Sequence, residues 1–242
     1  MQETKSAQLL EIFSSLQGEG PYAGNPTTFV RFQGCPIGCR WCDTRESWSA
    51  ATPHFRVETP PRSRDFKFGN NPVTPEQLNL WLKPFPDSWL SVTGGEPLEQ
   101  ADFLADWLPT VQEKTVLLET AGIHTQGLAK VLPHVDIVSM DFKLPSSTST
   151  PAYWQQHQQF LQLSVSGKKE IYVKIVVTQT TTESDLRKAA ELVKQTARET
   201  LVVLQPVAGQ SAPDTRAAEE IFWRHELQFM VLPQLHKARG VL

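Results

Sequence analysis

The sequence predicts an α/β fold in which about six parallel strands form a partial, open β/α barrel. Strand-like and helix-like segments alternate along the 242 residues, and several of the strand-like segments are almost continuously apolar. That apolar character is typical of parallel strands that are covered on both faces. About six strand–helix units fall short of the eight that close a complete barrel, so we expect the barrel to be open.

Enrichment in β-branched and aromatic residues predicts the strands in order. We expect strands at 27–33, 89–93, 115–119, 136–140, 170–178 and 201–205. The first helix is expected after Thr74, an N-cap residue that is followed by Pro75 at the first helical position. Further helices are expected at 97–112, 124–132, 151–163, 183–200 and 213–225, where the apolar residues have helical spacing.

One segment interrupts this alternation. Residues 49–73 are rich in proline and polar residues and have no clear period. We expect an irregular insertion or lid there, with a disordered surface loop as the alternative. We expect the whole chain, residues 1–242, to form a single domain.

Composition excludes several functional classes. The 23 Lys and Arg against 26 Asp and Glu give a net charge of −3, which argues against a protein that mainly binds a nucleic acid backbone. No apolar run approaches the roughly 18 residues of a membrane span. No apolar secretory segment is visible near the N-terminus. We therefore expect a cytoplasmic protein that has neither a nucleic acid nor a membrane as its partner.

The three cysteines lie together directly after an expected strand, with the spacing C-x3-C-x2-C at Cys35, Cys39 and Cys42. A disulfide scaffold spreads its cysteines along the chain, so this cluster indicates metal or redox chemistry. Structural zinc takes four ligands, usually from two C-x2-C pairs, and the sequence has no second pair. An iron–sulfur cube held by three thiolates keeps one iron open for catalysis. A zinc site or unrelated buried thiols remain the alternatives.

A second motif, Gly94-Gly95-Glu96-Pro97, follows an expected strand and precedes an expected helix. The two glycines allow the backbone to approach a ligand closely. The start of the helix favours a carboxylate, and Glu96 could accept hydrogen bonds from an ammonium group. The motif therefore fits a ligand that carries both groups, as methionine does.

Together these motifs carry a resemblance to a known family. The cysteine spacing, with Trp41 before the last cysteine, is similar to the signature of the radical S-adenosylmethionine (SAM) superfamily, and Gly-Gly-Glu resembles its SAM-binding motif. The segments QGEG at 17–20, WCDT at 41–44 and LPQLHK at 232–237 resemble the 7-carboxy-7-deazaguanine synthase family more narrowly. Matching segments run from about residue 9 to the end of the chain.

The resemblance implies a fold, a reaction and its cofactors. It implies a radical-SAM-like core and a carbon–nitrogen lyase that uses a [4Fe–4S] cluster, SAM and Mg²⁺. A 5′-deoxyadenosyl radical would take hydrogen from C6 of 6-carboxy-5,6,7,8-tetrahydropterin. The ring would contract with loss of ammonia to give 7-carboxy-7-deazaguanine, a precursor of queuosine-type tRNA bases. It also implies an electron donor such as flavodoxin or ferredoxin, and a homodimer.

The resemblance assigns roles position by position, and none of the side chains is assigned as a catalytic acid or base. It implies cluster ligands at Cys35, Cys39 and Cys42, and a Mg²⁺ ligand at Thr44. It implies SAM contacts at Gly95, Glu96, Asp141, Phe142, Lys143, Gln205 and Pro206, where some relatives have Ser-Pro-Lys in place of Asp-Phe-Lys. It implies substrate contacts at Leu16, Gln17, Gly18, Arg31, Thr93 and His236.

The residues alone favour plainer roles at two of these positions. Thr44 could cap its own backbone, and Arg31 could face solvent or pair with Glu11. The histidines that match no motif are expected at the surface or at helix ends: His54, His124, His134, His157 and His225. The rival functions are a radical-SAM activase that installs a glycyl radical on a partner protein, and a zinc-binding interaction module.

Overall fold

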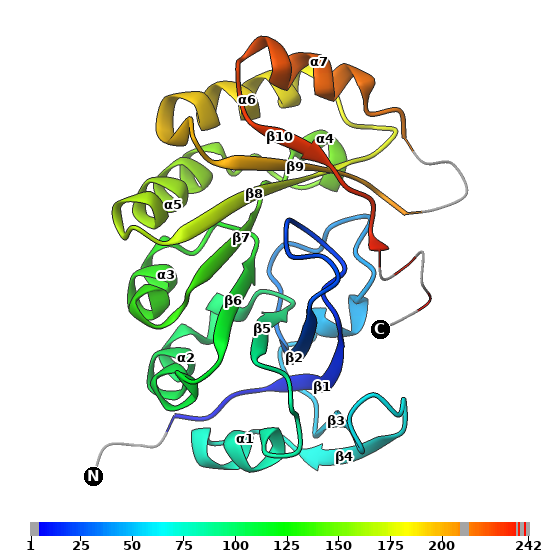
Figure 1. Cartoon of the computed structure of the whole chain (residues 1–242), viewed down its shortest axis with the longest axis vertical. Coiled ribbons are helices and arrows are strands. Elements are labelled where there is room, and N and C mark those ends of the chain that lie inside the picture. The colour runs from blue at the N-terminus through cyan, green and yellow to red at the C-terminus, as the bar shows by residue number, and fades with distance from the viewer. Residues whose placement is uncertain (1–4, 209–212, 236, 238–239, 241–242) are drawn as a thin grey trace.

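A ten-stranded sheet runs through the part of the chain that the structure describes, and the strand order is β10-β9-β8-β7-β6-β5-β2-β1-β3-β4. The structure is a computed structural model that describes residues 5–208, 213–235, 237 and 240. Helices lie along the outer side of the curved sheet, and its inner side is open (Figure 1). This arrangement is the partial β/α barrel that the sequence predicts.

The six predicted strands are confirmed as consecutive, parallel neighbours in the sheet. They are β2 (Pro26–Phe32), β5 (Trp89–Gly94), β6 (Thr115–Thr120), β7 (Ile137–Asp141), β8 (Glu170–Val177) and β9 (Leu201–Pro206). Parallel order places their carboxyl ends at the same edge of the sheet, where ligands of α/β proteins gather.

Four further strands complete the sheet: β1 (Leu9–Leu16), β3 (His54–Glu58), β4 (Phe66–Asn70) and β10 (Phe229–Val231). The prediction of an irregular segment at 49–73 is therefore wrong for two stretches, because β3 and β4 form an antiparallel pair and β3 also pairs with β1. Phe55 is buried there and packs edge-on against Trp81, with ring centroids 5.8 Å apart.

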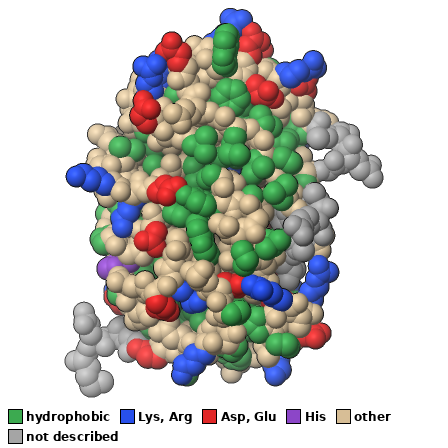
Figure 2. Space-filling model, viewed as in Figure 1, with side chains coloured by type: hydrophobic (Ala, Val, Ile, Leu, Met, Phe, Trp, Pro, Cys, Tyr) green, Lys and Arg blue, Asp and Glu red, His purple; other side chains and the backbone are tan. Residues whose placement is uncertain are grey.

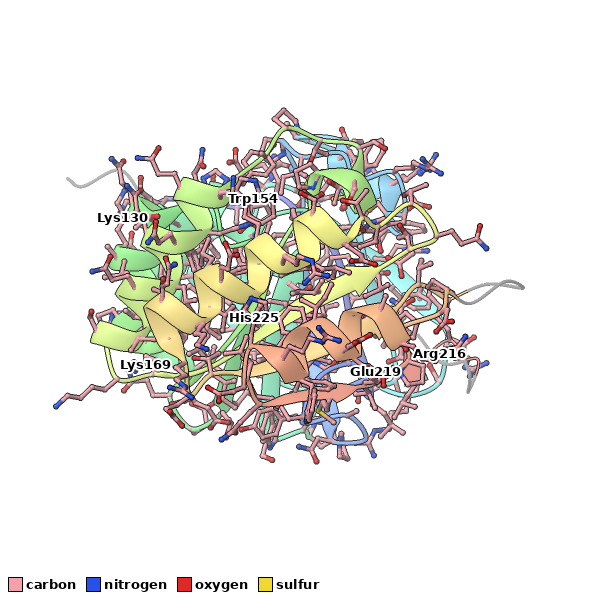
Figure 3. All side chains as sticks on the ribbon, turned by 90° about the horizontal axis from the view of Figure 1, so that it is seen from above. Lys130, Trp154, Lys169, Arg216, Glu219 and His225 are labelled. Atoms are coloured by element: carbon pink, nitrogen blue, oxygen red, sulfur yellow. The ribbon has the colours of Figure 1, made fainter. Side chains whose placement is uncertain are left out.

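Helices cover the outer face: α1 (Pro75–Leu82), α2 (Ala101–Trp107), α3 (Thr125–Val131), α5 (Trp154–Ser166), α6 (Glu183–Ala197) and α7 (Arg216–Arg224). The short helix α4 (Pro145–Thr148) lies instead next to the loop of the three cysteines, where Ser147 contacts Trp41. Short 3₁₀ turns stand at Arg45–Trp48, Pro97–Gln100, Leu108–Val111 and Leu132–His134. The predicted helix at 97–112 is thus broken into two 3₁₀ turns around α2. Seen from above, α6 and α7 lie side by side over the sheet, with Arg216 at the start of α7 and His225 just after its end (Figure 3).

Strand parity divides the molecule into a core and a polar interior. Because successive side chains alternate between the two faces, one set of strand residues packs under the helices. The other set faces the inside of the barrel, where its amino-terminal members form an apolar cluster: Leu117, Ile137, Tyr172 and Val203. Two residues further along the same strands the inward side chains are polar: Glu119, Ser139, Lys174 and Gln205. Apolar side chains also gather across the middle of the face shown in Figure 2.

Candidate functional site

A cavity of about 780 Å³ opens at the carboxyl ends of the strands. Thirteen of the seventeen residues predicted for the site line it: Leu16, Gln17, Gly18, Arg31, Cys35, Cys39, Cys42, Thr44, Thr93, Gly95, Asp141, Lys143 and Gln205. Glu96, Phe142 and Pro206 are described but do not line it. His236 lies outside the described residues.

The cysteine loop follows β2 and turns its three thiols toward this cavity. Cys39 is buried among Ile37 and Ala121, whereas Cys35 and Cys42 are half-buried. Burial raises the pKa of the Cys39 thiol to about 11, and the positive charge of Lys143 opposes that rise. A bound metal would have to displace this proton, because the thiolate is the ligand.

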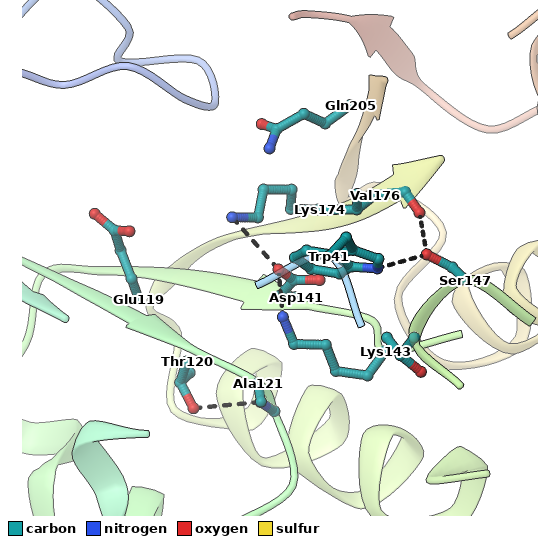
Figure 4. Close-up of polar contacts among 12 residues, drawn as sticks. Trp41, Glu119, Thr120, Ala121, Asp141, Lys143, Ser147, Lys174, Val176 and Gln205 are labelled. Atoms are coloured by element: carbon teal, nitrogen blue, oxygen red, sulfur yellow. Dashed lines mark hydrogen bonds and ion pairs between the residues drawn. The ribbon is translucent and has the colours of Figure 1, made fainter. Parts of the chain in front are cut away.

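Two tryptophans hold the loop in place. Trp48 Nε1 donates to the sulfur of Cys42 at 3.3 Å. Trp41 Nε1 donates to Ser147 Oγ at 2.9 Å, and Ser147 Oγ donates in turn to the Val176 carbonyl at 2.9 Å. Figure 4 shows these two hydrogen bonds, which link Trp41 of the loop through Ser147 to β8. The loop is therefore fixed against the barrel by side chains on both sides of its last cysteine.

The residues present fit an iron–sulfur cluster with a polar ligand beside it. Thiolates are the ligands that such clusters take. Asp141 Oδ1 and Gln205 Oε1 are buried and accept no hydrogen bond from the residues that the structure describes. Both side chains line the cavity, so these acceptors suit a ligand with ammonium or hydroxyl donors. Within the described residues, no three His, Cys, Asp or Glu side chains are grouped to hold a single metal ion.

The glycine pair serves the protein's own packing. A Cβ on Gly94, whose φ is +151°, would lie 2.3 Å from the Phe32 carbonyl oxygen. A Cβ on Gly95 would lie 2.4 Å from the Gly34 oxygen and 2.7 Å from that of Ser47. Both positions need glycine, because the end of β5 touches the backbone of β2 at Phe32 and the backbone that flanks the cysteines at Gly34 and Ser47.

The side chain of Glu96, which was predicted to contact SAM, does not face the cavity. Its side chain is fully buried, and its carboxylate accepts from Thr120 Oγ1 at 2.8 Å, Ala121 N at 2.7 Å and Leu98 N at 3.1 Å. Burial raises the pKa of Glu96, and these three hydrogen bonds oppose the rise. In this structure the carboxylate ties the ends of β5 and β6 together instead of facing the cavity.

Two lysines and two carboxylates form a connected network on the cavity wall. Figure 4 shows the part of this network in which Asp141 meets Lys143 and Lys174. Asp141 Oδ2 lies 2.8 Å from Lys143 Nζ and 3.4 Å from Lys174 Nζ, and Lys174 also pairs with Glu19. Burial lowers the pKa of Lys174, but Glu19 and Asp141 outweigh it and hold the pKa well above its usual value. The Lys143 ammonium lies 4.6 Å from the centre of the Trp41 ring.

Glu19, Glu119 and Lys174 line the cavity, and none of the three was predicted as a site residue. Glu119 accepts from Gln17 Nε2 at 2.9 Å and from Ser91 Oγ at 2.6 Å. The alternation of strand side chains could have identified Glu119 and Lys174, since each is an ionisable residue within a predicted apolar strand. Glu19 stands in a loop, where no period marks an inward position.

Arg31 forms the ion pair with Glu11 that the residues alone favour, whereas the Thr44 side chain makes no capping hydrogen bond. Arg31 Nε donates to Glu11 Oε1 at 2.8 Å, which is the pairing that the residues alone favour, and Arg31 also lines the cavity. Thr44 Oγ1 donates to Asp43 Oδ1 at 3.0 Å, and the Thr44 carbonyl accepts from Ser47 N. Asp43 Oδ2 pairs with Lys237 at 3.0 Å.

The side chain of Phe142 does not reach the cavity, and the surface position expected for His157 is wrong. Phe142 has the outward parity of β7 and stacks on His157 with ring centroids 4.6 Å apart. His157 is fully buried on α5, and its Nε2 lies 3.2 Å from the Ala121 carbonyl. Both rings therefore belong to the packing behind the cysteine loop. Pro206 is half-buried beside the cavity, and its neighbour Gln205 lines the wall.

Known proteins resemble this chain over nearly its whole length. The 4Fe-4S single cluster domain family matches residues 16–153. The 7-carboxy-7-deazaguanine synthase of Geobacter sulfurreducens is 35% identical, and the match covers 98% of each chain. The 7-carboxy-7-deazaguanine synthase of Thermoplasma acidophilum is 33% identical, with 95% of each chain covered.

Solved structures share the fold. QueE from Escherichia coli superposes with a TM-score of 0.64 at 22% identity, and the match covers 93% of each chain. Streptococcus suis SuiB bound to S-adenosylmethionine gives a TM-score of 0.54 at 11% identity, and the match covers 87% of this chain and 53% of SuiB. In the described residues no helix has the length and apolar character needed to span a membrane.

Proposed function

Because the chain belongs to the 7-carboxy-7-deazaguanine synthase family of radical SAM enzymes, we propose that it converts 6-carboxy-5,6,7,8-tetrahydropterin to 7-carboxy-7-deazaguanine with loss of ammonia. The observation that carries the proposal is the cavity at the strand ends. The three thiols of one loop meet there with Gln17, Arg31 and Thr93, which come from other elements.

Cys35, Cys39 and Cys42 would hold a [4Fe–4S] cluster with SAM beside it. When bound, this pair supplies a 5′-deoxyadenosyl radical for hydrogen abstraction from C6 of the substrate. Asp141 Oδ1 and Gln205 Oε1 are free to accept hydrogen bonds from SAM. The buried network around Asp141 would hold these groups in place before the ligand arrives.

The pterin would lie toward β1, β2 and β5. Gln17 and Thr93 both donate to Glu119, Thr93 at 3.4 Å, so the three form one polar wall. Amide, hydroxyl and carboxylate groups suit the mixed donors and acceptors of a pterin edge. Arg31 lines the same cavity and would bind the substrate carboxylate. Phe13 and Phe29 stack 4.9 Å apart and add an apolar surface to it.

Mg²⁺ is the third proposed cofactor, with Thr44 as its protein ligand. A single hydroxyl suits an ion that keeps several waters. We expect Thr44→Ala to weaken the stimulation of turnover by Mg²⁺ at least about tenfold, while iron and sulfide content stay unchanged. Thr44→Ser keeps the hydroxyl and should retain the stimulation. If the alanine and serine variants respond equally to Mg²⁺, Thr44 does not hold the ion.

The remaining parts of the proposal follow the family. The product would feed the synthesis of queuosine-type tRNA bases. We propose a small electron-transfer protein such as flavodoxin or ferredoxin as the reductant, a homodimer as the assembly, and the cytoplasm as the compartment.

The direct test is an oxygen-free assay with the carboxytetrahydropterin, SAM and dithionite, in which the product is identified by mass. We expect 7-carboxy-7-deazaguanine together with ammonia. SAM cleavage without any deazaguanine product would contradict the proposal and favour a glycyl-radical activase. A colourless protein that contains zinc alone would favour an interaction module.

A further inference from the structure

Two arginines share one buried carboxylate at one end of the cavity. Glu11 of β1 lies in register with Arg31 of β2 and with Arg56 of β3. Arg31 Nε donates to Glu11 Oε1 at 2.8 Å, and Arg56 Nη2 donates to Oε2 at 2.6 Å. All three side chains line the cavity. They form a single row across three strands, and one end of it belongs to the segment 49–73.

This row carries one more positive than negative charge. The Glu11 side chain is only 7% exposed, and each of its oxygens accepts from a different arginine. The lysines of the cavity wall are each matched by a carboxylate: Lys143 by Asp141, Lys174 by Glu19 and Lys237 by Asp43. Glu46 and Glu119 add negative charge elsewhere on the wall, so the Arg31–Arg56 end is the part of the cavity where positive charge exceeds negative charge. This end attracts an anionic group on a ligand.

Arg56 and Arg31 each donate to a different oxygen of Glu11. A guanidinium carries five N–H donors, and within the described residues one hydrogen bond of the Arg31 side chain is recorded, the bond from Nε to Glu11. Arg56 donates to the second oxygen of Glu11 and competes there with the remaining donors of Arg31. The remaining donors of Arg31 can then bind another planar anion. Phe66 supports Arg56 with its ring centroid 5.4 Å from the guanidinium carbon.

We propose that Arg56 is a specificity-determining residue for the carboxylate of the substrate. The inference rests on the proposed function and extends it to the hairpin β3–β4. Arg56 acts through Glu11 by positioning Arg31, and directly through its charge at the cavity. The hairpin thereby makes the site prefer a carboxylated pterin over one that lacks the carboxylate.

The test uses the reconstituted, oxygen-free protein with SAM and two fluorescent probes, 6-carboxypterin and pterin without the carboxyl group. Fluorescence titration gives Kd for each probe in wild type, Arg56→Gln, Arg56→Lys and Lys67→Gln. Lys67 is the matched control, because it is exposed on the same hairpin, does not line the cavity and carries the same charge. Thermal unfolding checks that all the variants are folded.

We expect Arg56→Gln to raise the Kd of 6-carboxypterin about tenfold and that of pterin less than about twofold. Arg56→Lys should recover part of the loss at low salt, and the difference between wild type and Arg56→Gln should shrink from about 50 to about 500 mM NaCl. The Lys67→Gln variant should bind both probes as wild type does.

Three results would overturn the inference. Arg56→Gln could match Lys67→Gln with 6-carboxypterin, or it could weaken both probes equally, as a merely structural residue would. In both cases the proposed function stands if wild type prefers the carboxylated probe. A wild-type protein that binds neither probe would remove the proposed substrate, and the inference with it.

Discussion

His157 is a buried, neutral histidine behind the cysteine loop. Burial lowers its pKa from 6.5 to about 4, and the smaller effect of its hydrogen bond to Ala121 opposes this. The native protein therefore keeps the ring neutral at pH values where the unfolded chain is already protonated. Below pH 6.5 the proton stabilises the unfolded state, so stability is lost as the pH falls.

We predict that the free energy of unfolding falls between pH 6.5 and about 4, by about 3 kcal/mol from this residue alone. Denaturant unfolding at several pH values measures it in wild type and in His157→Gln, which has no titratable ring. His54→Gln, at an exposed histidine, is the control. The pH profile of His157→Gln should be flatter than both others, and parallel profiles in all three proteins would exclude this role.

The alternation of side chains along β7 and beyond its end also explains which residues of this segment reach the cavity. Asp141 and Lys143 are two positions apart and both line the cavity, whereas Phe142 between them is 1% exposed and packs in the core. Resemblance to a family motif identifies the segment that lies at the site. The alternation of side chains along a strand then determines which residues of that segment can contact a ligand. Applied to the sequence, alternation would have placed Phe142 on the helix side.

At the scale of elements, the end of β5 and the cysteine loop are joined by backbone contact. A Cβ on Gly95 would meet the carbonyl oxygens of Gly34 and Ser47. These are backbone atoms, which cannot rotate away as a side chain can. The geometry of the loop that carries Cys35 therefore depends on a residue that lies sixty positions further along.

We predict that Gly95→Ala displaces the cysteine loop and lowers cluster content after reconstitution at least about twofold, with the helical circular dichroism retained. Iron and sulfide analysis measures this. Gly127→Ala on α3 is the control, because a Cβ there meets its neighbours only at 3.1 Å or more. Wild-type iron content in Gly95→Ala would contradict the assigned contact.

Prediction of the strands succeeded where the apolar run is nearly continuous and failed where polar or charged residues interrupt it. The parallel strands were found because helices cover one face and a largely apolar interior covers part of the other. The hairpin β3–β4 was missed because charged residues interrupt its apolar positions and the turns and prolines around it hide the alternation. Strand β1 was missed because its inward face carries Glu11, a charge that is paired only across strands.

At the scale of the whole molecule, Glu19 joins segments from distant parts of the chain. It lies in the loop between β1 and β2 and pairs with Lys174 of β8. It also accepts from Gln205 Nε2 at 3.0 Å and from Gln234 Nε2 at 2.7 Å. The Leu235 amide donates to the Gly18 carbonyl at 2.9 Å beside it. The open side of the barrel is thus crossed by contacts between the first and last parts of the described chain.

We predict that Glu19→Gln destabilises the protein by about 2 kcal/mol, which lowers Tm by about 4–8 °C. The amide keeps the size of the side chain but leaves the buried Lys174 ammonium less well compensated. Glu226→Gln is the control, because Glu226 pairs with Lys194 and Arg198 at the exposed surface. That change should cost less than about 1 kcal/mol. Equal losses of Tm in the two variants would show that Glu19 is no more than a surface partner.

Much of the site could be predicted because cluster binding uses a short local motif, so the sequence itself contains the spacing of Cys35, Cys39 and Cys42. The charged residues Glu19, Glu119 and Lys174 could not be grouped in this way, because they come from separate elements that only the folded barrel brings together.

The central claim is that three thiols hold a cubane cluster whose fourth iron binds SAM. Electron paramagnetic resonance of the oxygen-free, reduced protein tests it most directly, with and without SAM. We predict about four irons and four sulfides per chain and a cluster signal that changes shape when SAM is added. A protein without a cluster signal, or a signal that SAM leaves unchanged, would contradict the account.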